Sequence, residues 1–219
     1  MRFHKKLDKT TIFVIIFDIN IPMRSVIMYK MCKTEQSAAR QRQLEQGLLS
    51  AMLTMRYEDI NLSDMCQQLE IPRKSFYRYF SGKDGALQAL IDHTLMEYGT
   101  YSAGLRTERR TLELDLEQFF QFWQTQKDLL DALQRSDLSG ILVERSIRHA
   151  VTESFFPGRF LQHETKLMKQ HVVSFAMCGL MTLMVQWHHN GYQETPAELA
   201  QVSSRLLTKP LFPTSRQLF

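Results

Sequence analysis

The stretch that decides the fold runs from Tyr57 to Leu87 and reads YEDINLSDMCQQLEIPRKSFYRYFSGKDGAL. Two short segments with apolar residues at helical spacing are separated here by only Glu70-Ile71-Pro72. Asn61 is a favourable N-cap for the first segment, whereas Pro72 cannot continue that helix but suits the start of the next. Two short helices joined so tightly predict a helix-turn-helix, whose second helix enters the major groove of DNA.

The second segment concentrates positive charge. From Pro72 to Lys83 there are four basic residues and no acid, with hydroxyl side chains between them. Basic groups neutralise phosphates, hydroxyls orient a protein on the DNA backbone, and Arg or Lys also pairs with guanine edges. A stretch rich in Tyr and Phe is more often core, and we interpret Phe76 and Phe80 in that way. The candidate DNA-binding residues are Arg73, Lys74, Ser75, Tyr77, Arg78, Tyr79 and Lys83.

The composition of the whole chain is that of a globular protein. Of 219 residues, 44% are hydrophobic and 23% charged, which excludes a disordered or collagen-like chain. The net charge of +4 arises in residues 1–33, where seven Lys or Arg face two acids, whereas residues 34–98 carry seven against nine. The three cysteines are far apart and form neither a disulfide framework nor a CxxC metal site, so we expect a reducing cytoplasm.

Residues 1–33 are interpreted as an N-terminal extension outside the working domain. A basic start precedes an apolar stretch over residues 10–31, but its longest unbroken apolar run, Ile12 to Phe17, is too short for a signal sequence or a membrane span. Met23, Met28 and Met31 are alternative starts. Membrane attachment through residues 10–31 is the other interpretation, and we expect no stable membrane insertion.

From Thr34 onward the pattern is helical, which predicts an all-α protein. The polar segment from Gly99 to Arg110 is the expected joint between a first domain, residues 34–98, and a second, residues 99–219. In the second domain we expect an aromatic helix after Leu112 and a last helix that is capped at Thr195 and begins with Pro196. Between them we expect helices over about Ser139 to Phe155 and Phe160 to Trp187.

The head of the chain resembles the tetracycline-repressor (TetR) family of bacterial transcription regulators over about residues 35–98. The resemblance rests on Arg56-Tyr57, on Phe76-Tyr77-Arg78-Tyr79-Phe80, and on Lys83 with Leu87. It implies a TetR-like fold, in which a three-helix DNA-binding head precedes a helical ligand-binding and dimerisation domain. It also implies that Leu62–Leu69 is the supporting helix and Arg73–Phe80 the recognition helix.

The same resemblance implies roles for the candidate residues. Tyr77 and Lys83 match positions that touch phosphates, and Arg73, Lys74, Ser75 and Arg78 lie where base edges or the backbone are met. The chain departs from the family pattern in the turn, with Glu70 in place of Gly and Pro72 in place of Ser, and at Lys74 in place of Gly. A left-handed Glu costs about 1 kcal/mol, so a differently shaped turn is the alternative.

The helix over Phe160 to Trp187 is apolar nearly all round from Val172, which predicts burial on every side and therefore a second copy of the chain. The dimer-interface candidates are Val172, Phe175, Ala176, Gly179, Leu180, Leu183 and Met184. Aromatic side chains could line an effector cavity or simply pack the core. The candidates for such an effector pocket are Phe119, Phe122, Trp123, Phe155 and Trp187.

Together these patterns predict a cytoplasmic homodimeric repressor that binds a palindromic operator in double-stranded DNA. As the resemblance implies, a small-molecule ligand would release it. We expect no cofactor and no metal, and no enzyme, because the chain has no nucleophile–base signature, phosphate-binding loop or metal-ligand spacing. The alternative is a helix-turn-helix-derived protein-interaction module without DNA binding, which Glu70 and the acidic balance of residues 34–98 favour.

Overall fold

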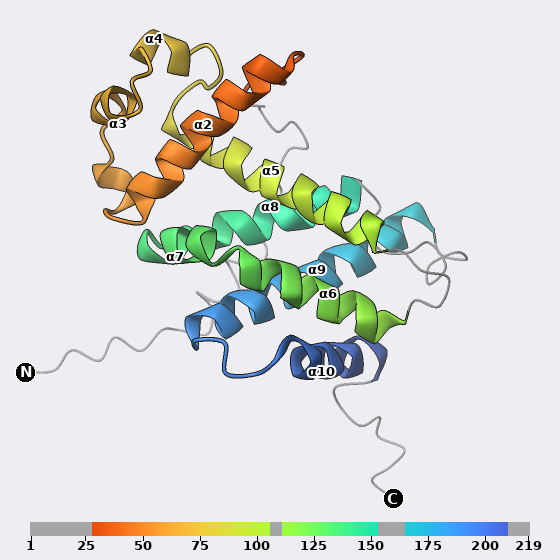
Figure 1. Cartoon of the computed structure of the whole chain (residues 1–219). Helices are drawn as coiled ribbons and strands as arrows, with labels where there is room; N and C mark the ends of the chain where they lie inside the picture. Colours follow the sequence, from red (N-terminus) through yellow and green to blue (C-terminus); the bar gives the residue numbers. More distant parts are fainter. Residues whose placement is uncertain (1–27, 106–110, 153–164, 210–219) are drawn as a thin grey trace, which may run out of the picture.

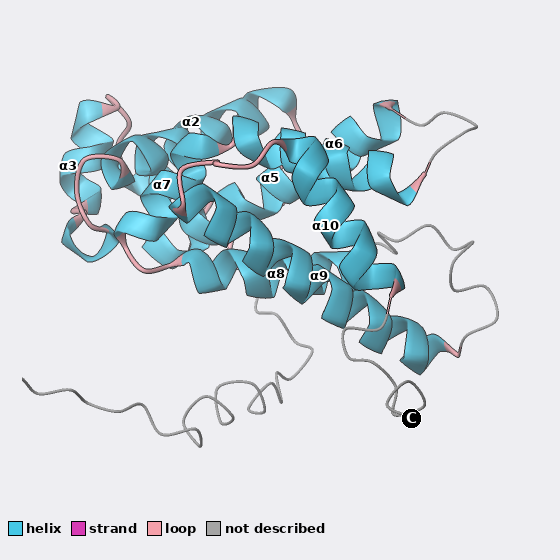
Figure 2. Ribbon diagram, turned by 90° about the horizontal axis from the view of Figure 1, so that it is seen from below, coloured by secondary structure: helices cyan, strands magenta, loops and turns pink. Residues whose placement is uncertain are grey.

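The computed structural model describes residues 28–105, 111–152 and 165–209. Within these ranges the chain is helical, and no strand occurs beyond an isolated antiparallel bridge between Tyr29 and Phe80. Figure 2 shows the described part as helices joined by short loops. The prediction of an all-α protein is confirmed.

Three helices and a short 3-10 turn form the head at one end of the molecule (Figure 1). They are α2 (Glu35–Met52), η1 (Tyr57–Asp59), α3 (Leu62–Gln68) and α4 (Arg73–Phe76). Thr34 caps α2 by accepting from the amide of Ser37, and Asn61 caps α3 by accepting from the amide of Ser63, as the sequence indicates. The core of the head gathers fully buried side chains from each helix, among them Leu44, Leu48, Met65, Phe76 and Phe80.

Helix α5 (Lys83–Gly104) connects the head to the second part of the molecule without a break (Figure 1). Its first half packs on α2, and the helix also contacts α6 and α8. The expected joint, Gly99 to Arg110, begins inside this helix and extends past its end at Gly104, and the division into two domains there stays a prediction. A glycine on the exposed side of a helix with nothing near its Cα is tolerated there, at a cost of about 1 kcal/mol.

The second part contains α6 (Leu112–Thr125), α7 (Lys127–Arg135), α8 (Ser139–Thr152), α9 (Lys166–His189) and α10 (Pro196–Thr208). Helix α10 packs along α6 and α8 packs along α9. Thr195, Pro196 and Glu198 form the predicted capping box and proline start of α10. The sequence pattern does not predict α7 as a separate helix, because only a local turn at Gln126 separates it from α6. Residues 153–164, which include the predicted ends of two helices, lie outside the described residues.

Helix α9 is buried on one side only. Ala176, Leu180 and Met184 lie in the protomer's own core, whereas Phe175 is 76% exposed and Val172 and Gly179 are also exposed. The helices α6, α7 and α8 contact α9, and the burial of Ala176, Leu180 and Met184 within one chain does not favour them as interface residues, so their place in a dimer interface stays a prediction. Leu183 is half-buried.

By length and composition α9 also passes as a membrane-spanning candidate among the described helices, with 33% of its apolar window buried. A core helix of a soluble protein passes the same test, so this is weak evidence for a membrane. The exposed apolar face of α9 needs another explanation.

Residues Met28–Lys33, here termed the N-terminal strap, pack against the end of the recognition segment. The Lys30 amide donates to the Tyr79 carbonyl (2.7 Å), and the Met28 carbonyl accepts from the Ser81 amide (2.9 Å). A Cβ at Gly85 would lie 2.3 Å from the Met28 carbonyl oxygen, so the strap requires glycine there. The interpretation of residues 1–33 as lying wholly outside the working domain is thus wrong for the strap.

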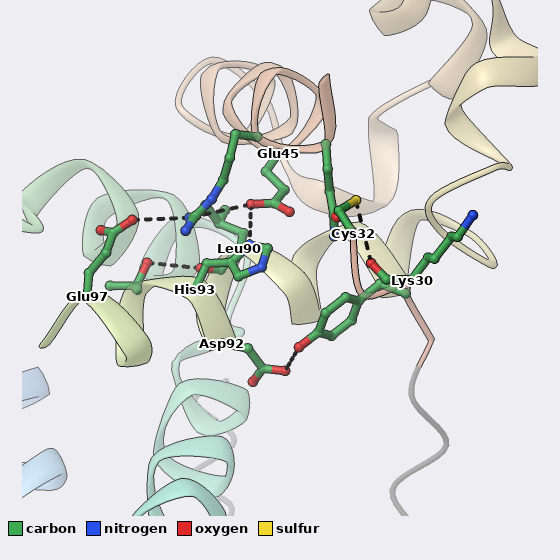
Figure 3. Close-up of polar contacts among 11 residues, drawn as sticks. Lys30, Cys32, Glu45, Leu90, Asp92, His93 and Glu97 are labelled. Carbon is green, nitrogen blue, oxygen red and sulfur yellow. Dashed lines mark hydrogen bonds and ion pairs between the residues drawn. The ribbon is translucent and has the colours of Figure 1, made fainter. Parts of the chain in front are cut away.

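Asp92 of α5 joins the strap to the second part of the molecule, and Figure 3 shows its contact with the strap. Its carboxylate accepts from the Tyr29 hydroxyl (2.7 Å) and from Nε of Arg145 on α8 (2.6 Å), and Arg145 also makes a second, bidentate contact. Burial, and then the hydrogen bond to Asp92, raises the pKa of Tyr29 well above its usual value. Strap, α5 and α8 therefore share one carboxylate.

We expect Asp92→Asn to lower the free energy of unfolding by about 2 kcal/mol or more, because it leaves a largely buried Arg145 without its charge partner. The matched control is Glu144→Gln on α8, which removes the partner of Arg148 in a more exposed pair and should cost less than about 1 kcal/mol. Urea unfolding of both variants measures the difference. Equal losses would contradict the role assigned to Asp92.

Candidate nucleic-acid interface

The turn between α3 and α4 keeps a left-handed residue although that residue is not glycine. Glu70 has φ of 54°, and the next amide, that of Ile71, donates back to the Cys66 carbonyl (2.9 Å). Ile71 is buried at 3% exposure, which anchors the turn in the hydrophobic core. Of the two alternatives for this turn, the structure has the left-handed glutamate, with its side chain exposed.

The recognition segment, Arg73–Phe80, is a shorter helix than predicted. Helix α4 ends at Phe76, and the chain continues as turns in which the amides of Tyr79 and Phe80 both donate to the Phe76 carbonyl (3.0 and 3.1 Å). The helix cannot continue regularly because the Tyr79 carbonyl is used by the strap and Phe80 forms the bridge with Tyr29. Phe76 and Phe80 are 0% and 2% exposed, which confirms their interpretation as core.

Four of the seven candidate DNA-binding side chains are exposed together on this segment: Arg73, Lys74, Tyr77 and Arg78. The Arg73 guanidinium lies over the Tyr77 ring at 5.6 Å and donates to its hydroxyl (3.1 Å), which orders both side chains. None of the three cations has an ion pair within the described part of the chain. Ser75 is half-buried and Tyr79 is buried, at 9% exposure.

Lys83, the seventh candidate, is engaged inside the head. Its ammonium donates to the carbonyls of Tyr57, Glu58 (3.2 Å) and Ile60 (3.1 Å), and lies over the Tyr57 ring at 4.5 Å. The Tyr57 hydroxyl in turn donates to Asp84 (2.6 Å); burial, and then this bond, raises the pKa of Tyr57. Lys83 thus ties η1 to the start of α5, and its phosphate contact stays a prediction.

Sequence reasoning missed three basic residues that face the recognition segment from another part of the chain. Lys30 and Lys33 of the strap and Arg40 of α2 border a groove that Ser75 and Arg78 also line. No local sequence signal indicates this, because the pairing between the strap and Tyr79 joins residues about fifty positions apart.

A small cavity lies among α5, α6, α8 and α9. Its volume is about 10 Å³, and Phe119 and Trp123 line it together with Ser146 and His149. Of the other pocket candidates, Phe122 packs on Tyr98 and Tyr101 instead, and Trp187 packs on Phe120 while donating its Nε1–H to the Glu194 carbonyl. Neither side chain lines this cavity, and their role as pocket residues stays a prediction. Phe155 lies outside the described residues.

Within the described ranges no group of three His, Cys, Asp or Glu side chains is placed to hold a metal ion. His188, one of a histidine pair in the sequence, is instead buried and shares a hydrogen bond of 2.8 Å with Asp131. This histidine therefore has a structural partner.

Comparisons with known proteins show a family match over the second part of the chain and a shared fold. Residues 111–209 match the TetR family described as "Transcriptional regulator C-terminal region". No curated protein sequence matches the chain closely enough to add to this.

Among solved structures, a TetR-family transcriptional regulator from Streptomyces coelicolor is similar with a TM-score of 0.52 and 18% identity, covering 78% of this chain and 79% of that one. A TetR-like regulator from Rhodococcus sp. RHA1 gives 0.50 and 16%, covering 79% and 98%. The dihydroxyacetone kinase operon activator DhaS gives 0.52 and 14%, covering 76% and 93%. At these identities the likeness concerns the fold.

Because Glu70 is left-handed, we expect glycine at this position to give a more stable protein than alanine. We expect Glu70→Gly to be more stable than Glu70→Ala by about 1 kcal/mol, because alanine keeps the left-handed strain whereas glycine does not. Both variants remove the same carboxylate, so the comparison isolates the backbone. Thermal or urea unfolding measures it, and a Glu70→Ala variant at least as stable as Glu70→Gly would show that the turn has changed shape.

Proposed function

Because this chain has the fold of TetR-family transcriptional regulators and carries their C-terminal region, we propose that it is a sequence-specific DNA-binding regulator that acts as a homodimeric repressor. Regulators of this family are transcription factors and not enzymes. Its place of action is the cytoplasm, where bacterial DNA is accessible.

The observation that carries the proposal is the unpaired positive charge on the recognition segment. Arg73, Lys74 and Arg78 are exposed and lack ion pairs within the described residues, while Phe76 and Phe80 anchor the segment from behind. Unpaired cations on a braced helix suit a polyanion, because DNA binding releases condensed counterions for each phosphate that is neutralised. Lys74 and Arg78 can also reach guanine edges in the major groove.

Dimerisation follows from the small size of the recognition segment and from the exposed face of α9. One helix of four residues contacts few base pairs, and twofold symmetry would place two such segments on a palindrome. The exposed stripe on α9 provides the surface for a second copy. It consists of Leu167, Met168, Val172, Phe175 and Gly179.

The effector part of the proposal concerns the cavity beside Trp123. A volume of about 10 Å³ holds roughly one water molecule, whereas ligand pockets need several hundred Å³. A small apolar ligand would therefore have to separate α8 or α9 from α6, and by favouring that opened state it would release DNA. Trp123 fluorescence during titration with apolar compounds tests this, and the absence of any compound that shifts both fluorescence and DNA affinity would contradict it.

A protein-interaction module without DNA binding is the second candidate. The exposed Glu70 carboxylate beside the recognition segment favours it, because a carboxylate there repels phosphates. Gel mobility shift with the duplex upstream of the protein's own gene separates the two functions.

We expect Arg73→Ala/Lys74→Ala to weaken binding to that duplex by about a hundredfold or more at 0.1 M salt, because two cations are lost from each protomer. The matched control is Arg205→Ala/Lys209→Ala, which removes the same charge from the exposed end of α10, at the far side of the molecule from the head (Figure 1). The control should bind as the wild type does. Equal losses in the two variants, or no binding by the wild type, would contradict the proposal.

We expect Phe175→Glu to convert a dimer into a monomer at micromolar concentration, because it places a charge in the centre of the proposed interface. Val202→Glu on α10 also replaces an exposed apolar side chain and should remain dimeric. Sedimentation equilibrium measures both. A monomeric wild type, or a Phe175→Glu variant that stays dimeric, would exclude this face of α9.

A further inference from the structure

A basic groove of about 700 Å³ separates the recognition segment from the N-terminal strap. Its lining includes Lys30 and Lys33 of the strap, Arg40 of α2 and Arg78 of the recognition segment. The single carboxylate that borders it belongs to Glu70. Four cations against one acid give this groove a charge opposite to the acidic balance of residues 34–98 as a whole.

The cations that border the groove are not used elsewhere in the described part of the chain. Lys30, Lys33 and Arg78 have neither an ion pair nor a side-chain hydrogen bond, and Arg40 donates only to Gln43 (3.0 Å). All four are exposed. Because like charges gathered around one groove repel, the arrangement gains free energy when an anion lies among them.

The strap is held firmly to the recognition segment, so its cations have a fixed place. Lys30 is bonded through its own amide to the Tyr79 carbonyl, and Ser81 bonds the Met28 carbonyl through both its amide and its hydroxyl (3.1 Å). The Tyr29 side chain is bonded to Asp92 and its ring meets His93 edge-on at 5.9 Å. Cations positioned in advance lose less conformational freedom on binding than cations on a free tail.

We propose that the strap and the start of α2 form a second DNA contact. In this contact Lys30, Lys33 and Arg40 bind backbone phosphates next to the DNA major groove that the recognition segment enters. This inference rests on the proposed DNA-binding function and extends its surface beyond the helix-turn-helix. Because α4 has only four residues, phosphate contacts from the strap add affinity and orient the segment without adding base specificity.

The test measures how binding to DNA depends on salt. The full-length protein is titrated into a fluorescently labelled 30-base-pair duplex of random sequence over a series of NaCl concentrations. For Lys30→Ala/Lys33→Ala we expect the slope of log K against log [NaCl] to fall in magnitude by about two to four for a dimer, and affinity to drop about ten- to a hundredfold at 0.1 M salt. Lys30→Arg/Lys33→Arg should retain the slope, since it keeps both charges.

Two controls show whether an effect of the strap variant comes from a general loss of charge or from a loss of folding stability. Arg205→Ala/Lys209→Ala loses the same charge on α10 and should keep the wild-type slope. The thermal midpoint of Lys30→Ala/Lys33→Ala should equal that of the wild type, because both side chains are exposed and unbonded.

The outcomes distinguish this inference from the proposed function. If Arg73→Ala/Lys74→Ala loses binding while Lys30→Ala/Lys33→Ala keeps the wild-type slope, the second contact is refuted and the DNA-binding function stands. If the wild type binds no duplex, both the second contact and the DNA-binding function are refuted. If inorganic phosphate alone saturates the protein through Lys30 and Lys33 while the DNA slope is unchanged, the groove binds a free anion, which also overturns the proposal.

Discussion

One carboxylate, that of Asp92, links the strap, α5 and α8. It lies on α5, the single helix that runs from the head into the second part of the molecule, and it accepts from Arg145 on α8 and Tyr29 on the strap. Arg145 is followed by Ser146 and His149, which line the cavity, while Tyr29 is followed by Lys30, which is bonded to the recognition segment. The charge pair therefore links the head, through α5 and the strap, to α8 of the second part.

The recognition segment is held in place by contacts other than ion pairs of its own cations. Arg73, Lys74 and Arg78 have no ion pair within the described residues, as the proposed DNA binding requires, so the segment relies on what lies behind and beside it. Phe76 and Phe80 anchor it in the core, and the strap binds its end. The left-handed Glu70 adds strain that this bracing tolerates.

Local signals in the sequence predicted much of this, and contacts between distant residues explain what they missed. The caps at Thr34, Asn61 and Thr195 depend on neighbours two or three residues away, so short-range patterns predict them. Local patterns do not predict the contacts of the strap, because its partners, Tyr79 and Asp92, lie far along the chain. Apolar residues all round α9 predict burial on every side, but periodicity does not say which faces a single chain covers, and Phe175 is exposed.

Selection of duplexes from a random pool by the full-length protein tests the central claim most directly. The account predicts enrichment of one inverted repeat, whose two half-sites lie about one helical turn, or a small multiple of it, apart, as expected for a pair of recognition segments related by twofold symmetry. A pool that stays random after repeated rounds of selection, or that yields a single half-site without its inverted partner, would contradict the claim.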